Sequence, residues 1–192
     1  MSAFLKYIHD FTPHLSIEHW VVIFAISFAA AFFILKSNKV TRDGSIALVC
    51  SILIGLFILD SLTVNRLITG AKPQYSGLDL SAELQRLIAP ADTTRISMLF
   101  NVLAFIPFGF FLSWGILGIR HLNRKRCINR VVLIALGLSF CIEFLQFILK
   151  VGFFELTDMI LNTFGAVMGA VIVSGLYSLL SYFRRSSVIM NK

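Results

Sequence analysis

The chain has 192 residues, of which 57% are hydrophobic and only 14% are charged. Soluble domains carry about 45–50% apolar and about 25% charged residues, so this composition excludes an ordinary soluble globule, a disordered chain and a secreted disulfide scaffold. The formal net charge of +7 would suggest a nucleic-acid partner in a soluble protein. Here the basic residues lie between apolar runs, as membrane topology requires, so we expect membrane lipids and no nucleic acid as partners.

Five stretches are long and apolar enough to cross a hydrocarbon core of about 30 Å, which takes about 20 helical residues. They are residues 17–35, 45–64, 98–119, 131–149 and 159–183. None of them alternates between apolar and polar residues as a barrel strand does. The sequence therefore predicts an all-α, polytopic helical membrane protein with about five transmembrane helices, folded as a single membrane domain over residues 1–192.

The N-terminal segment contains His9, His14 and His19. A spacing of five residues does not place the rings on one helical face, so we predict no metal site and a polar membrane interface around Trp20. The sequence also lacks a P-loop, a Gly-x-Gly-x-x-Gly motif and a Cys-x-x-Cys pair. We therefore expect no bound cofactor. None of the cysteines falls in a segment that the distribution of Lys and Arg places on the outer side of the membrane, so we expect no disulfide.

The longest connection between apolar stretches covers residues 65–97. Within it, Leu80, Leu84, Leu87 and Ile88 follow helical spacing, with polar residues on the opposite face. This pattern predicts an amphipathic helix that lies on the membrane surface or over the mouth of a cavity. A solvated connector with one surface helix explains the pattern equally well.

The orientation in the membrane follows from Lys and Arg, which concentrate in cytoplasmic loops. Most of them lie in residues 36–44, 120–130 and 184–192, and fewer lie in the alternate segments. We therefore predict that the N-terminus is outside and the C-terminus inside, in a multi-pass protein of the inner (plasma) membrane. The basic run 120–130 also fits a patch that binds lipid headgroups or nucleic acid.

Polar residues inside the predicted spans are the main functional signal, because such groups usually face protein or water. With the predicted orientation, six of them fall toward the outer leaflet: Asp60, Asn101, Glu143, Gln146, Asp158 and Asn162. Spacings of three and four residues place four residues on one helical face, namely Ser139, Glu143, Gln146 and Lys150. The same spacings place Asp158 and Asn162 on one face of the next span. The short connector 150–158 makes these two spans antiparallel neighbours.

These faces predict an outward-opening polar pocket. Two carboxylates, Glu143 and Asp158, could act as general acid and base. The candidate substrate-binding residues are Asn101, Gln146, Lys150, Asn162, Asp60 and Arg95. The alternative is interhelical hydrogen bonding that only stabilises the bundle. For Asp60, a role in the pocket and a position that simply marks the polar edge of its span explain the sequence equally well. The step Gly165-x-x-x-Gly169 favours close helix packing over dimerisation, and the sequence leaves the oligomeric state open.

Asn101 with Phe105-Ile106-Pro107-Phe108-Gly109 resembles the "Asn…Phe-Ile-Pro-Leu-Gly" span of VanZ-like membrane proteins. Glu143-x-x-Gln146 and Asp158-x-x-x-Asn162-Thr163-x-Gly165 resemble the second half of that signature, which covers residues 98–173. The family often has an Arg after the Gln segment, and here Lys150 is the candidate for that charge.

The resemblance implies a cell-envelope protein, since the family's named member is associated with low-level resistance to the lipoglycopeptide teicoplanin. One hypothesis is a protein that binds an outer-leaflet lipid, a cell-wall precursor or a lipoglycopeptide. A second is an enzyme that uses Glu143 and Asp158 on an isoprenoid- or phospho-linked lipid. A third is a proton-coupled transporter, which the lack of an inverted repeat disfavours.

Overall fold

The computed structural model describes residues 25–26, 29–30, 40–64, 88, 92–119, 123–152 and 154–190. This part contains four long α-helices, α3 (Arg42–Leu59), α6 (Asp92–Leu117), α7 (Arg124–Ile148) and α8 (Leu156–Met190), and a short π-helix, η1 (Asp60–Val64), that continues α3. One isolated antiparallel bridge joins Val40 to Ile119. The predicted all-α class is therefore confirmed for the described residues.

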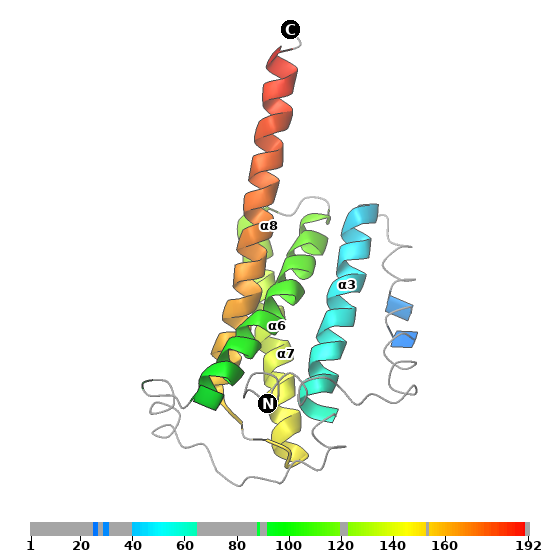
Figure 1. The fold of residues 1–192 in the computed structure, drawn as a ribbon. Coiled ribbons are helices and arrows are strands. Elements are labelled where there is room, and N and C mark those ends of the chain that lie inside the picture. The colour runs from blue at the N-terminus through cyan, green and yellow to red at the C-terminus, as the bar shows by residue number, and fades with distance from the viewer. Residues whose placement is uncertain are drawn as a thin grey trace, which may run out of the picture.

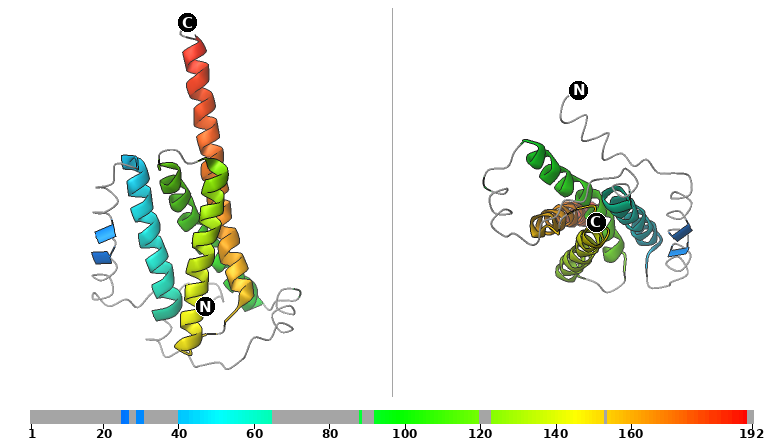
Figure 2. Two further views of the ribbon diagram at one scale, coloured as in Figure 1. Left: turned by 180° about the vertical axis from the view of Figure 1, so that it is seen from behind. Right: turned by 90° about the horizontal axis from the view of Figure 1, so that it is seen from below.

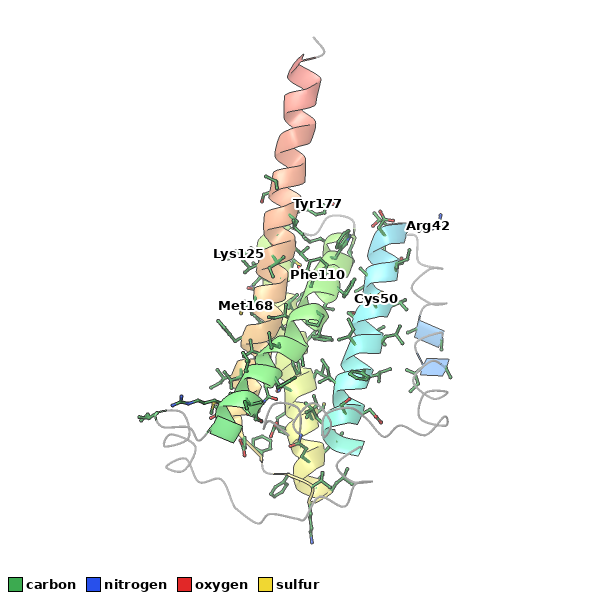
Figure 3. All side chains as sticks on the ribbon, in the orientation of Figure 1. Arg42, Cys50, Phe110, Lys125, Met168 and Tyr177 are labelled. Carbon is green, nitrogen blue, oxygen red and sulfur yellow. The ribbon has the colours of Figure 1, made fainter. Side chains whose placement is uncertain are left out.

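The four long helices stand in one bundle and alternate in direction along the chain (Figures 1 and 2). Helices α3 and α7 run one way, and α6 and α8 run the other. Helix α8 continues well past the other three, with the C-terminus at its far end. Arg42 and Lys125, at the starts of α3 and α7, lie toward the end from which α8 projects (Figure 3).

Within the part of the chain that the structure describes, four helices are long and apolar enough to cross a membrane: Arg42–Thr63, Arg95–Leu117, Lys125–Ile148 and Leu156–Leu179. They correspond to four of the five predicted spans. Of the first predicted span, 17–35, the structure describes residues 25–26 and 29–30, which are helical, and the rest lies outside the described residues. Of the predicted amphipathic helix in the loop 65–97, the structure describes Ile88, which is helical and exposed. The rest of that helix and the histidines near the N-terminus lie outside the described residues.

All four helices begin earlier than their apolar stretches. For α3 and α7 a capping residue marks the start. Thr41 caps α3, and its Oγ1 accepts a hydrogen bond of 3.2 Å from the amide of Gly44. Asn123 caps α7 in the same way, with its Oδ1 3.0 Å from the amide nitrogen of Arg126. Much of the predicted basic loop 120–130 is thus the first two turns of α7.

Cys127 consequently lies inside the bundle. Its place in the basic segment 120–130 had predicted a cytoplasmic loop instead. Its side chain is buried, and its sulfur is 3.3 Å from the hydroxyl of Ser113 on α6. The cysteines among the described residues, Cys50, Cys127 and Cys141, are all free. Near the same end, the amide of Thr41 donates to the carbonyl of Gly118, which ties the start of α3 to the end of α6.

Helices α6 and α8 pack backbone to backbone through small residues. A Cβ added to Gly165 would meet the carbonyl group of Val102, and one added to Gly169 would meet that of Ile106. From the first contact to the second, the position moves four residues toward the C-terminus on both helices, so α6 and α8 are parallel. The predicted role of this glycine step in close packing is therefore confirmed, since helices approach this closely only where side chains are absent.

The outer faces of the bundle are apolar. Leu133 is 68% exposed, and Ile160 is 65% exposed. A soluble protein rarely exposes so many large apolar side chains together, whereas lipid chains cover them in a membrane. The interior combines apolar residues such as Phe105 and Ile142 with an unusual number of buried polar groups, which gather mainly at the end of the bundle opposite the α8 projection.

Candidate functional site

The buried polar residues at this end come from η1 and three helices. They are Asp60, Ser61 and Thr63 on η1, Asn101 on α6, Ser139, Glu143 and Gln146 on α7, and Thr157 and Asn162 on α8. Asp158 is half-buried, while Arg95 and Lys150 are exposed. The structure thus buries five of the eight predicted site residues together at one end, and leaves the two predicted cationic ones at the surface.

The seam between α7 and α8 fixes the register of the site. The Nδ2 of Asn162 donates a 2.8 Å hydrogen bond to the hydroxyl of Ser139, and both side chains are buried. Since the two helices are antiparallel, one turn further along α7 matches one turn back along α8. That step places Glu143 opposite Asp158, so the two carboxyl groups occupy the same level of the seam.

Asn162 keeps one polar atom without a partner. Within the described part of the chain, its Oδ1 is buried and has no hydrogen-bond donor, although the residue is only 1% exposed. Burying an unsatisfied amide oxygen costs about 1–3 kcal/mol. Asn101 lies beside this turn, because the next residue on α6, Val102, contacts Gly165 of α8.

Glu143 has a structural partner that sequence reasoning did not foresee. Its Oε2 accepts a 2.9 Å hydrogen bond from the amide of Glu155, the residue directly before α8. The first amide groups of a helix have no partner within it, and the helix dipole favours negative charge there. Glu143 therefore stabilises the start of α8 from the neighbouring helix.

Gln146 joins α7 to the π-helix. Its Nε2 donates a 3.2 Å hydrogen bond to the carbonyl of Leu62 in the middle of η1. In the same π-helix the hydroxyl of Thr63 donates to the carbonyl of Leu59, at 2.6 Å. A π-helix is rare and often marks a functional site, and here it turns Asp60 and Ser61 into the bundle, where both are buried.

Lys150 terminates α7 in a left-handed conformation. Its φ angle is 57°, and the amides of Lys150 and Val151 donate to the carbonyls of Phe147 and Gln146. This pair of bonds is the Schellman motif, in which the left-handed position is usually glycine. The backbone of Lys150 thus ends the helix, and its side chain is exposed.

Replacing Lys150 by glycine should raise the free energy of unfolding by about 1 kcal/mol, because a left-handed conformation costs a residue with a Cβ about 1–2 kcal/mol. The measurement is unfolding of the purified protein in detergent micelles. Leu149→Gly is the matched control: Leu149 has a right-handed φ of −75°, so glycine there should lower stability. A loss of stability in Lys150→Gly would show that the lysine side chain makes an essential contact.

The buried polar residues of this end that sequence reasoning missed are Ser61, Thr63 and Thr157. Ser and Thr are common in membrane helices, so each alone carries little signal. The spacing of four residues before Glu143 already places Ser139 on the same polar face, and the structure buries it there. The π-helix has no sequence signature of its own. Among the described residues there is no group of three or more His, Cys, Asp and Glu side chains that could hold a metal ion together.

A comparison with protein-family models matches residues 20–180 to the family described as VanZ/LLP1. The match covers most of the chain and extends beyond the signature region 98–173 on both sides. No curated protein and no solved structure matches the chain.

Proposed function

Because the chain belongs to the VanZ/LLP1 family, we propose that this multi-pass membrane protein binds the polar part of an outer-leaflet amphiphile at the buried polar end of its bundle. The amphiphile is a membrane lipid, a lipid-linked cell-wall precursor or a lipoglycopeptide. Protection against teicoplanin-type antibiotics would follow if the bound molecule is the antibiotic or its target. The candidate contacts are Asn101, Gln146, Asp158 and Asn162, with Asp60 from the π-helix.

One observation carries this proposal: the Oδ1 of Asn162, buried between helices that face lipid, has no donor among the described residues. Polar side chains at membrane depth are costly and usually face a partner, water or a ligand. Ordinary helix packing would be served by a serine, whose single hydroxyl can be satisfied across one seam. An amide that uses only half of its hydrogen-bonding capacity is better explained by a ligand that uses the other half.

The distribution of Lys and Arg supports an outward-facing site. Arg42 and Lys125 lie toward the opposite end of the bundle (Figure 3), and positive residues favour the cytoplasmic side. In this orientation the polar end meets the outer leaflet, where lipid-linked precursors and lipoglycopeptides are found. The apolar outer face of α7, with Phe140 and Phe144 stacked at 5.7 Å, offers a surface for acyl chains beside Glu143.

A second candidate function is a membrane enzyme that acts on a lipid. The observation that favours it is the register of the seam, which sets Glu143 and Asp158 at one level and so provides two carboxyl groups for acid and base roles. The hydrogen bond from Glu155 to Glu143 counts against it, because it gives one of these groups a structural task.

The test is to purify the full chain with its bound lipids and to identify these by mass spectrometry. Wild type should retain a defined amphiphile, and Asn162→Leu should lose it. Ser113→Ala, which changes a buried hydroxyl near the opposite end of the bundle, is the matched control and should retain it. Equal lipid content in all three proteins would contradict the proposal.

The enzyme alternative uses the same preparations. Envelope lipids and precursors are incubated with wild type and with Glu143→Gln, and products are identified by mass spectrometry. A product made by wild type alone would replace the binding function by an enzymatic one. We expect no product from either protein.

A further inference from the structure

The first two turns of α7 concentrate positive charge at the end of the bundle from which α8 projects. Residues 124–126 are all Lys or Arg, and Arg130 follows Arg126 one turn later. The first turn of the helix holds no acidic residue. Positive side chains at a helix N-terminus oppose the helix dipole, and like charges four residues apart repel each other. This arrangement is unfavourable within the protein and favours an anion from outside it.

Arg126 and Arg130 lie on the lipid-facing face of α7. Cys127 and Val131, which directly follow them in the chain, are fully buried on the opposite side of the helix. Spacings of four and three residues continue the lipid-facing face along α7. Its members are all exposed: Arg126, Arg130, Leu133, Gly137, Phe140 and Phe144. A Cβ added to Gly137 would meet nothing within 4 Å, so the described part of the chain leaves this face open there.

The two arginines lie at the depth of a lipid headgroup. The apolar span of α7 begins at Lys125, so both guanidinium groups reach the headgroup layer by extending along the helix. From Arg130 to Phe140 the helix rises about 15 Å at about 1.5 Å per residue. This length matches half of a hydrocarbon core of about 30 Å. One lipid can therefore place its phosphate at the arginines and an acyl chain along Leu133 and Gly137.

The protein offers this arginine pair little negative charge. The only acidic residue of α7 is Glu143, which bonds the start of α8 at the other end of the bundle. Among the described helices, Asp43 is the one acidic residue at the same end as the arginines. It lies in the first turn of α3, where it suits the dipole of that helix. An anionic ligand thus complements a positive charge that is in excess at this end.

We propose that the lipid-facing face of α7 binds an anionic phospholipid, whose phosphate bridges Arg126 and Arg130. A guanidinium group donates paired hydrogen bonds to phosphate oxygens, so two of them one turn apart fit one phosphate. A net negative charge is favoured because a zwitterionic headgroup carries an ammonium group that offsets the attraction. In the orientation that the Lys and Arg distribution favours, this end is cytoplasmic. The site then lies in the opposite leaflet from the proposed amphiphile site and is independent of it.

The experiment titrates three lipids with identical acyl chains into the full chain in a non-ionic detergent and measures binding by native mass spectrometry. Phosphatidylglycerol has a net negative charge, whereas phosphatidylethanolamine and phosphatidylcholine are zwitterionic. We expect phosphatidylglycerol to bind about tenfold more tightly than the other two lipids, because both arginines attract its net charge. Replacing Arg126 and Arg130 together by glutamine should abolish this preference.

A second double variant separates a site from the general charge of this end. Arg42→Gln with Lys125→Gln also removes two exposed positive charges from the same end of the bundle (Figure 3). Arg42 lies on α3, and Lys125 lies about 100° round α7 from Arg126, so neither belongs to the lipid-facing face. This control should keep the preference for phosphatidylglycerol. Because all four side chains are exposed, both double variants should unfold at the same temperature as wild type. Asn162→Leu, at the other end, should also keep the preference.

Four results would overturn the proposal. Equal loss of the preference in both double variants would mean that the general charge of this end attracts the lipid. Equal binding of the three lipids to wild type would mean that α7 recognises no anionic headgroup. Displacement of phosphatidylglycerol by inorganic phosphate or by a short oligonucleotide would make the arginine pair a site for those anions. A dimer that takes up no phosphatidylglycerol would mean that a second copy of the chain covers this face.

Discussion

Replacing Gly169 by alanine is expected to destabilise the protein by about 1–3 kcal/mol, although alanine is the better helix former by about 1 kcal/mol. The reason is the backbone contact between α6 and α8. A Cβ at this position would overlap the carbonyl of Ile106 and the amide nitrogen of Phe110. Neither atom can turn away as a flexible side chain would, so the helices must separate.

Gly175 provides the matched control on the same helix. A Cβ added there meets nothing within 4 Å, so Gly175→Ala should raise the free energy of unfolding by about 0.5–1 kcal/mol through helix propensity alone. The same substitution should thus have opposite signs at two positions of α8, six residues apart in the printed sequence. The measurement is reversible unfolding in mixed micelles.

Gly109 lies on the other side of this contact and tests it independently. Its added Cβ would overlap the carbonyl group of Ala166 on α8, so Gly109→Ala should also destabilise the protein. If Gly169→Ala and Gly109→Ala were as stable as Gly175→Ala, the two helices would not be in backbone contact.

Much of this helix contact was accessible from the sequence, because a Gly-x-x-x-Gly step and a period of 3.6 residues encode it directly. The same holds for the polar faces of α7 and α8: Glu143 with Gln146, and Asp158 with Asn162, follow from spacing alone. Hydrophobicity also located the spans. Hydrophobicity did not locate the first residues of α3 and α7, because capping by Thr41 and Asn123 sets where these two helices begin.

The partner of Glu143 could not be predicted. It is a backbone amide, that of Glu155, and backbone amides look alike in every sequence. Its position depends on how the chain turns between α7 and α8, and that turn uses a left-handed lysine, Lys150, where sequence rules favour glycine. The π-helix at Asp60 was hidden for a related reason, since its stabilising contact comes from Gln146, far along the chain.

These two contacts change the interpretation of the acidic residues. From the sequence, Glu143 and Asp158 form a pair of carboxyl groups suited to acid and base roles. In the structure the two differ: Glu143 is buried and bonds the start of α8, whereas Asp158 is half-buried in the first turn of that helix. Glu143 therefore acts as a positioning residue, and Asp158 is the better candidate for direct contact with a ligand.

Glu143→Ala is accordingly expected to lower the free energy of unfolding by about 2–3 kcal/mol. A hydrogen bond to a charged acceptor contributes about 1.5–3 kcal/mol, and the missing side chain leaves a cavity in a buried position, since Glu143 is only 2% exposed. Without this bond the first turn of α8 should loosen, and Asp158 and Asn162 lie within the first two turns. Binding of the amphiphile should therefore fall together with stability.

Glu143→Gln separates positioning from acid–base chemistry. Its amide oxygen can still accept the amide of Glu155, so stability should fall by only about 1 kcal/mol, the value of the lost charge at a helix N-terminus. Lipid retention should persist, because the start of α8 stays in place. Unfolding in micelles and lipid mass spectrometry on the same preparations measure both effects. A Gln variant as unstable as the Ala variant would show that the charge, and not the hydrogen bond, holds α8. A Gln variant that is stable but loses a product formed by wild type would make Glu143 a catalytic residue.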